Sequence, residues 1–71
     1  MNNILIFRTN ISSEEERGRI GAALDACEGI QRWNVDLKDS DFVLRIDTPT
    51  LCSQHIIELV TREGYECSEL E

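Results

Sequence analysis

The sequence predicts an α+β fold in which one four-stranded antiparallel sheet carries two helices on one of its faces. Apolar and polar residues alternate over 30–37 and again over 42–47, which indicates two neighbouring strands. Over 13–27 and 49–63, apolar residues instead recur every three or four positions, as in amphipathic helices. Short strand-like runs at 4–7 and 65–68 complete the order strand, helix, strand, strand, helix, strand.

The first half of the chain predicts a strand followed by a helix. The unbroken apolar run Ile4–Phe7 is typical of a central strand that is covered on both faces. We expect a helix over Ser13–Cys27, which Gly29 ends in the usual C-terminal glycine position. Gly18 and Gly21 each lower helix stability by up to about 1 kcal/mol relative to alanine, so we expect close approach of this helix to the sheet.

The second half predicts a hairpin, a helix and a final strand. The polar segment 38–41 separates the two alternating runs and favours an antiparallel hairpin. Thr48 is expected to cap the second helix, with Pro49 in its first turn and Gly64 at its end. The last strand is expected over 65–68.

Each half is therefore a β-α-β unit, and right-handed crossovers place both helices on the same side of the sheet. This arrangement is the ferredoxin-like sandwich, which we expect to extend over 1–71 as a single domain. The opposite sheet face is then expected to lack helices and to be mostly polar. Its expected occupants are Asn34, Asp36, Val43, Arg45, Glu66 and Ser68.

Composition limits the classes of partner. The chain has 14 acidic and 7 basic residues, a net charge of −7, and no cluster of basic residues. This charge disfavours nucleic acid and anionic membrane surfaces, whereas a basic protein partner is electrostatically acceptable. The N-terminal residues carry no basic leader, and no segment approaches the roughly 20 apolar residues of a membrane span, so we expect a cytoplasmic protein.

The length and the residue inventory argue against an enzyme. A chain of 71 residues leaves little room for a deep substrate cavity. It contains one histidine and no glycine-rich phosphate loop or evident nucleophile–base arrangement. The three cysteines are widely spaced, so we expect them to fill the core rather than to form a disulfide framework.

Five segments carry a resemblance to a known family. They are "ILIF", "RIGAALDACEGI", "WNVDL", "VLRID" and "IIELVTREGYEC", with Gly-Ile and Gly-Tyr punctuation at matching spacing. Through them the chain resembles the heavy-metal-associated domain family of copper chaperones and copper-ATPase metal-binding domains. The resemblance covers nearly the whole chain and implies the same ferredoxin-like fold.

The resemblance also implies a changed metal site. In the family, Met-x-Cys-x-x-Cys between the first strand and first helix holds the metal. Alignment through Glu28–Ile30 without a gap places Ile11 at the methionine and Ser13 and Glu16 at the two cysteines. Thiolates select a soft ion such as Cu(I), and a hydroxyl with a carboxylate does not replace them. The family places the position of Tyr65 close to this loop, so the predicted binding residues are Ile11, Ser13, Glu16 and Tyr65.

The same loop matches a helix-start motif. Ser13-x-x-Glu16 and Ser12-x-x-Glu15 both fit the capping box, in which a hydroxyl and a carboxylate satisfy backbone N–H groups. Such a cap is worth about 0.5–2 kcal/mol. We therefore interpret the loop as a self-satisfied helix start, and the alternative is a hard-cation or small-ligand site built from Ser13, Glu15 and Glu16.

Cys52 and His55 form the remaining candidate metal pair. Their i, i+3 spacing on the second helix would let both side chains face one ion. A tight zinc site usually needs three or four protein ligands, so the simpler interpretation is a semi-buried thiol and a solvated imidazole.

The sequence thus predicts a non-enzymatic protein-interaction module with a metallochaperone-like fold, a degenerate metal site and no cofactor. The first alternative is a divergent copper or zinc carrier or sensor that binds a single metal ion through Cys27, Cys52, His55 or Cys67. A small-ligand regulatory domain that pairs two copies through the open sheet ranks last, because the predicted open face is polar.

Overall fold

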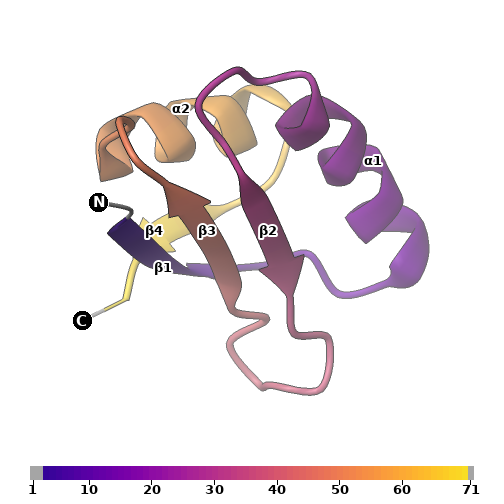
Figure 1. Cartoon of the computed structure of the whole chain (residues 1–71). Coiled ribbons are helices and arrows are strands. Elements are labelled where there is room, and N and C mark those ends of the chain that lie inside the picture. The colour runs from indigo at the N-terminus through magenta and orange to yellow at the C-terminus, as the bar shows by residue number, and fades with distance from the viewer. Residues whose placement is uncertain (1–2, 71) are drawn as a thin grey trace.

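The computed structural model of the chain describes residues 3–70 and confirms the predicted ferredoxin-like sandwich. Its sheet is antiparallel with strand order β2-β3-β1-β4, and both helices lie on one side of it (Figure 1). No helix within the described residues is long and apolar enough to cross a membrane. The elements are β1 (Asn3–Thr9), α1 (Glu14–Asp25), β2 (Arg32–Val35), β3 (Leu44–Thr48), α2 (Ser53–Arg62) and β4 (Cys67–Glu69).

The core lies between the sheet and the two helices. The central strands pair from Asn3 opposite Thr48 to Phe7 opposite Leu44. Because partners in this register project to the same side, alternate residues of β1 and β3 face the helices. Full burial of each large apolar side chain contributes about 1.5–3 kcal/mol. The fully buried core residues are Phe7, Ile11, Ile20, Leu24, Leu44, Ile46, Ile56 and Val60.

The prediction that β1 is covered on both faces is wrong. Ile4 is 57% exposed and Ile6 is half-buried, because the helices cover only the face that carries Leu5 and Phe7. An apolar run has the same appearance in a sequence whether or not anything covers its second face. The open sheet face therefore carries two isoleucines that were not expected there.

The first helix is shorter than predicted. It ends at Asp25, with Ala26 as its C-cap, so Cys27 lies just beyond it. Gly29 has a φ of +99°, which suits glycine, but it lies in the turn after the helix rather than at its end.

The prediction for the start of α2 is also wrong. Thr48 is the buried last residue of β3, and its hydroxyl donates to the Gly29 carbonyl and accepts from the Leu51 N–H. Pro49 follows in the connecting turn, and Cys52 is the N-cap of the helix. The threonine thus organises a turn rather than a helix start. Gly64, at a φ of +96°, follows the end of α2 as predicted.

The hairpin strands are shorter than their alternating patterns. The loop 36–43 separates them, and Phe42 in this loop has a φ of +45°. Asp36 and Val43 therefore lie outside the strands, and Val43 is 4% exposed rather than placed on the open face. Asn34 and Arg45 do share the open face, since they pair with each other in the register and Arg45 pairs with Ile6. Figure 1 shows the loop projecting from the end of the sheet.

Candidate functional site: the β1–α1 loop

Thr9 and Ile11 fix the start of the predicted site. The Thr9 hydroxyl donates to the Phe42 carbonyl at 2.6 Å and accepts from the Ile11 N–H at 3.2 Å. Ile11 is fully buried and belongs to the core cluster. Ile11 therefore anchors the loop in the core. The resemblance aligns this residue with the family's methionine.

Ser13 and Glu16 form the helix start. Ser13 is the N-cap, with extended backbone, and its Oγ accepts from the Glu16 N–H at 3.1 Å. In return, Glu16 Oε1 accepts from the Ser12 N–H and the Ser12 hydroxyl, each at 3.1 Å, and from the Ser13 hydroxyl at 3.3 Å. The capping interaction is therefore present. Its carboxylate reaches the N–H of Ser12 rather than that of the N-cap residue.

The electrostatics of this start favour an ionised Glu16. The hydrogen bond from the Ser12 N–H is the largest cause that lowers the pKa of Glu16 below its ordinary value, and the two serine hydroxyls add to it. The other two glutamates pair along the helix, Glu14 with Arg17 at 3.0 Å and Glu15 with Arg19 at 2.8 Å. Glu15 thus forms no second capping box with Ser12.

Within residues 3–70, no group of three or more His, Cys, Asp or Glu side chains is arranged to hold a metal ion.

Asn10 and Tyr65 connect the loop to the far end of the chain. Asn10 Oδ1 accepts from the Glu66 N–H at 2.8 Å, which ties the β1–α1 loop to the residues just before β4. Tyr65 is half-buried and packs against the core cluster that contains Ile11. The structure therefore brings Ile11 and Tyr65 to one cluster and leaves Ser13 and Glu16 at the helix start. The link through Asn10 was not predicted, and its only signal is an asparagine between strand and helix.

Several solved structures share the fold of this chain at low sequence identity. No protein-family model matches the chain, and no curated protein sequence does. A solved apo form of the heavy-metal-associated domain of a copper chaperone for superoxide dismutase superposes with a TM-score of 0.84 at 21% identity, over 100% of this chain and 69% of that one. Oxidised MerP from Ralstonia metallidurans CH34 gives 0.84 at 11% identity over 100% of both chains. The N-terminal domain of PacS from Synechocystis PCC6803 gives 0.79 at 17% identity, over 97% of this chain and 98% of that one.

This chain has the heavy-metal-associated fold. At these identities the likeness concerns the fold alone, and activity must be argued from the residues. The sequence holds cysteines at 27, 52 and 67 and no Cys-x-x-Cys. The correspondence of Ser13 and Glu16 with the family's two cysteines stays a prediction of the resemblance.

Cys52 and His55 lie at the start of α2. Cys52 is exposed rather than semi-buried, and its side chain makes no capping hydrogen bond, whereas His55 is exposed as predicted. The imidazole Nε2 of His55 is 3.8 Å from the sulfur of Cys27. In this fold the turn after α1 therefore meets the start of α2, a contact that the local Cys52-x-x-His55 spacing could not indicate.

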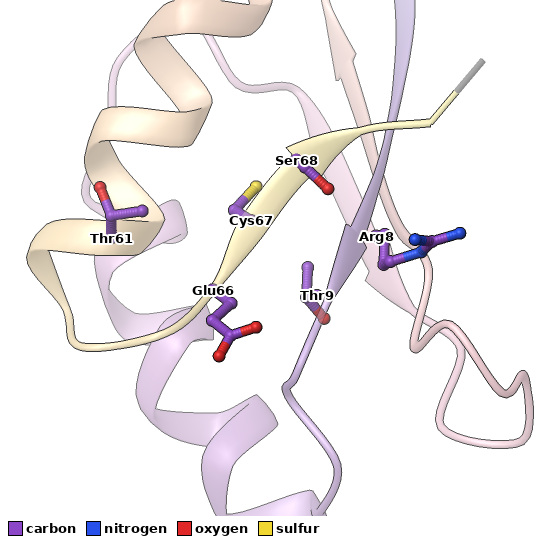
Figure 2. A pocket seen from close by; sticks show the side chains of 6 residues that line it. All are labelled: Arg8, Thr9, Thr61, Glu66, Cys67 and Ser68. Atoms are coloured by element: carbon purple, nitrogen blue, oxygen red, sulfur yellow. The ribbon is translucent and has the colours of Figure 1, made fainter.

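Cys67 lies beside a hollow of about 380 Å³ at β4 (Figure 2). Side chains from β1, β4 and the end of α2 line it, and Arg8 among them pairs with Asp41 at 3.1 Å. Burial raises the pKa of the Cys67 thiol to about 11. The thiolate is the form that binds metals and attacks electrophiles, so Cys67 at neutral pH is a neutral, largely structural thiol.

Proposed function

We propose that the chain is a non-enzymatic protein-interaction module whose metallochaperone-like fold carries a degenerate metal site. One observation supports this proposal most directly. The two groups that the resemblance places at the metal-binding cysteines, the Ser13 hydroxyl and the Glu16 carboxylate, hydrogen-bond to each other and to the helix start. A metal ion that used Ser13 Oγ or Glu16 Oε1 would compete with those bonds.

The chemistry of the donors points the same way. Hydroxyl and carboxylate oxygens are hard donors, whereas Cu(I) is selected by thiolates. Glu16 Oε1 already accepts three hydrogen bonds, so an ion that bound this oxygen would compete with those donors. In this proposal, Ser13 and Glu16 cap a helix and do not transfer a soft metal.

The partner in this proposal is another protein, and the location is the cytoplasm. Acidic side chains dominate α1 and the hairpin loop, and the net charge is −7. A basic partner stays a prediction for the acidic surfaces of α1 and the hairpin loop, because complementary charge raises association rates and selects partners. The thiol–imidazole contact of Cys27 and His55 has no acidic side chain hydrogen-bonded to the imidazole within the described residues, so we assign it no catalytic role.

The test compares Cu(I) uptake by the unmodified chain and by the Ser13→Cys/Glu16→Cys variant under reducing conditions, with intact-mass spectrometry as the readout. We expect the variant to take up one equivalent, because two thiolates then stand at i, i+3 spacing in the loop. We expect the unmodified chain to take up none at the same free copper concentration. Stoichiometric uptake by the unmodified chain would contradict the proposal.

A divergent soft-metal carrier or sensor is the second candidate. The observation that favours it is the 3.8 Å separation of Cys27 Sγ and His55 Nε2, since one ion with bonds of about 2.0–2.3 Å could bind both atoms. If the unmodified chain binds Cu(I) or Zn²⁺ and Cys27→Ser abolishes the binding while Cys52→Ser does not, this candidate replaces the first.

A further inference from the structure

We propose that the open sheet face docks an acidic segment of another protein, with Ile4 as the apolar anchor and Arg45 as the carboxylate contact. This inference rests on the proposed function and names the docking surface and the partner class. The open sheet face is the side of the sheet away from the helices. Its strand side chains are Ile4, Ile6, Arg8, Arg32, Asn34, Arg45, Asp47 and Ser68.

The strand register places the apolar and basic side chains in two adjacent rows. Ile4 lies opposite Asp47, which lies opposite Arg32, and in the next row Ile6 lies opposite Arg45. A hollow of about 200 Å³ lies over this part of the sheet, and Ile4 lines it together with residues of β2 and β3. An apolar side chain of a partner would fit into it beside Ile4.

Ile4 is the one large apolar side chain among residues 3–70 that is mostly exposed, at 57%. A single exposed apolar side chain is common on protein surfaces and carries little information alone. Here it borders a hollow that Arg32 and Arg45 also line. Arginine is enriched among the residues that carry most of the binding energy at protein–protein interfaces.

The charge of this face differs from the charge of the whole chain. Arg8, Arg32 and Arg45, three of the chain's seven basic side chains, project from it, whereas the sequence as a whole carries −7. Arg45 forms no ion pair within residues 3–70. Arg32 approaches Asp47 only at 3.6 Å and its side chain is 84% exposed. Two guanidinium groups are therefore available to carboxylates of a partner.

Asp47 is the acidic side chain among the arginines of the open sheet face. Its side chain is 14% exposed, and its Oδ1 is buried without a hydrogen-bond partner in the described part of the chain. That oxygen is inaccessible from the surface, so a docked segment does not reach it, and Asp47 contributes to this face through its contact with Arg32.

Two other occupants fit this face less well. A second copy related by a two-fold axis would stack the basic rows on themselves, and each copy carries −7. Nucleic acid needs a dense basic surface, whereas this face interrupts its arginines with Asp47 and the surrounding molecule is acidic. An acidic segment with apolar side chains matches both the hollow and the charge.

The test uses the full ¹⁵N-labelled chain and the peptide acetyl-Glu-Leu-Glu-Leu-Glu-amide as the probe, followed by NMR. We expect saturable shifts of the amide signals of Ile4, Arg32, Arg45 and Asp47. Arg45→Glu should weaken binding about tenfold or more, because a charge pair becomes a repulsion. Arg62→Glu is the matched control, since Arg62 is an exposed arginine on α2 without an ion pair in the described chain. Ile4→Ser should weaken binding independently of charge.

Several results would overturn this inference. The first two are chemical shift changes confined to other surfaces and an equal loss of peptide affinity in Arg62→Glu. The other two are equal or tighter binding of the same peptide with lysine in place of each glutamate, and tighter binding of oligothymidine to the same face. Shifts that depend on protein concentration without peptide would identify a second copy as the occupant. Cu(I) uptake is measured separately: uptake by the unmodified chain removes the proposed function, whereas failed peptide binding without metal uptake removes only the docking face.

Discussion

Glu16 joins both serines of the β1–α1 loop to the start of α1. One of its oxygens accepts three hydrogen bonds from two serines, and its own N–H donates to Ser13. A side chain in this arrangement is committed to the helix start. The same hydrogen bonds fix the conformation of the β1–α1 loop at the start of the helix.

The pH dependence of stability tests this arrangement. The pKa of Glu16 is lowered in the folded chain, so its stabilising contribution is present above the ordinary glutamate value of about 4.3 and is lost as pH falls through the lower folded value. We expect Glu16→Gln to lower the melting temperature at pH 7 and to match the unmodified chain once the pH lies below the folded pKa. Thermal unfolding by circular dichroism between these conditions measures the difference.

The control for this prediction is Glu14→Gln. Glu14 lies in the same helical turn, but it forms a surface ion pair with Arg17, and its side chain is 82% exposed. Surface pairs contribute little, so we expect a smaller effect at pH 7 and a weaker dependence on pH. Equal pH profiles for the two variants would show that helix charge, rather than the capping bonds, accounts for the effect of Glu16.

At the scale of elements, the contact between α1 and β2 depends on a glycine. A Cβ atom at Gly21 would lie 2.6 Å from Cζ2 and 2.7 Å from Cη2 of Trp33, whereas one at Gly18 would meet nothing within 4 Å. Trp33 also donates from Nε1 to Asp25 Oδ1 at 2.7 Å. The two glycines, equal in the sequence, therefore have different roles, and only Gly21 permits the close approach that was predicted for both.

These glycines give a matched pair of variants. Gly21→Ala should destabilise the chain, because overpacking costs about 1–3 kcal/mol and exceeds the helix-propensity gain of up to about 1 kcal/mol. Gly18→Ala should stabilise it by about 0.5–1 kcal/mol. Urea unfolding followed by the fluorescence of Trp33, the only tryptophan, gives both values. Stabilisation by Gly21→Ala would contradict the described packing.

The same scale shows what the sequence could and could not predict. The order of elements followed from periodicity, because alternation and 3.6-residue repeats are local. Thr48 was misassigned because threonine before proline suits both a helix cap and a turn, and the carbonyl of Gly29 that decides between them is distant in sequence. The Ser13–Glu16 cap was predictable because all its donors lie within five residues. The contact of Cys27 with His55 was not, because it joins the turn after α1 to α2, 28 residues further along the chain.

At the scale of the whole molecule, the fold separates two surfaces of different character. The helical side carries the three-glutamate run, and the open sheet face carries Ile4 and three arginines. Net charge alone suggested a basic partner, but charge is not uniform over the surface. A sequence reveals this only once the register assigns each side chain to a face.

The most direct test of the central claim is an NMR titration of the ¹⁵N-labelled, reduced chain with Cu(I) and with Zn²⁺, which follows the amide signals of Ser12, Ser13 and Glu16. We expect these signals to stay unchanged through one equivalent of either ion, because the loop oxygens already accept hydrogen bonds. Saturable shifts of these three signals at one equivalent would show that the loop binds metal and would contradict the central claim.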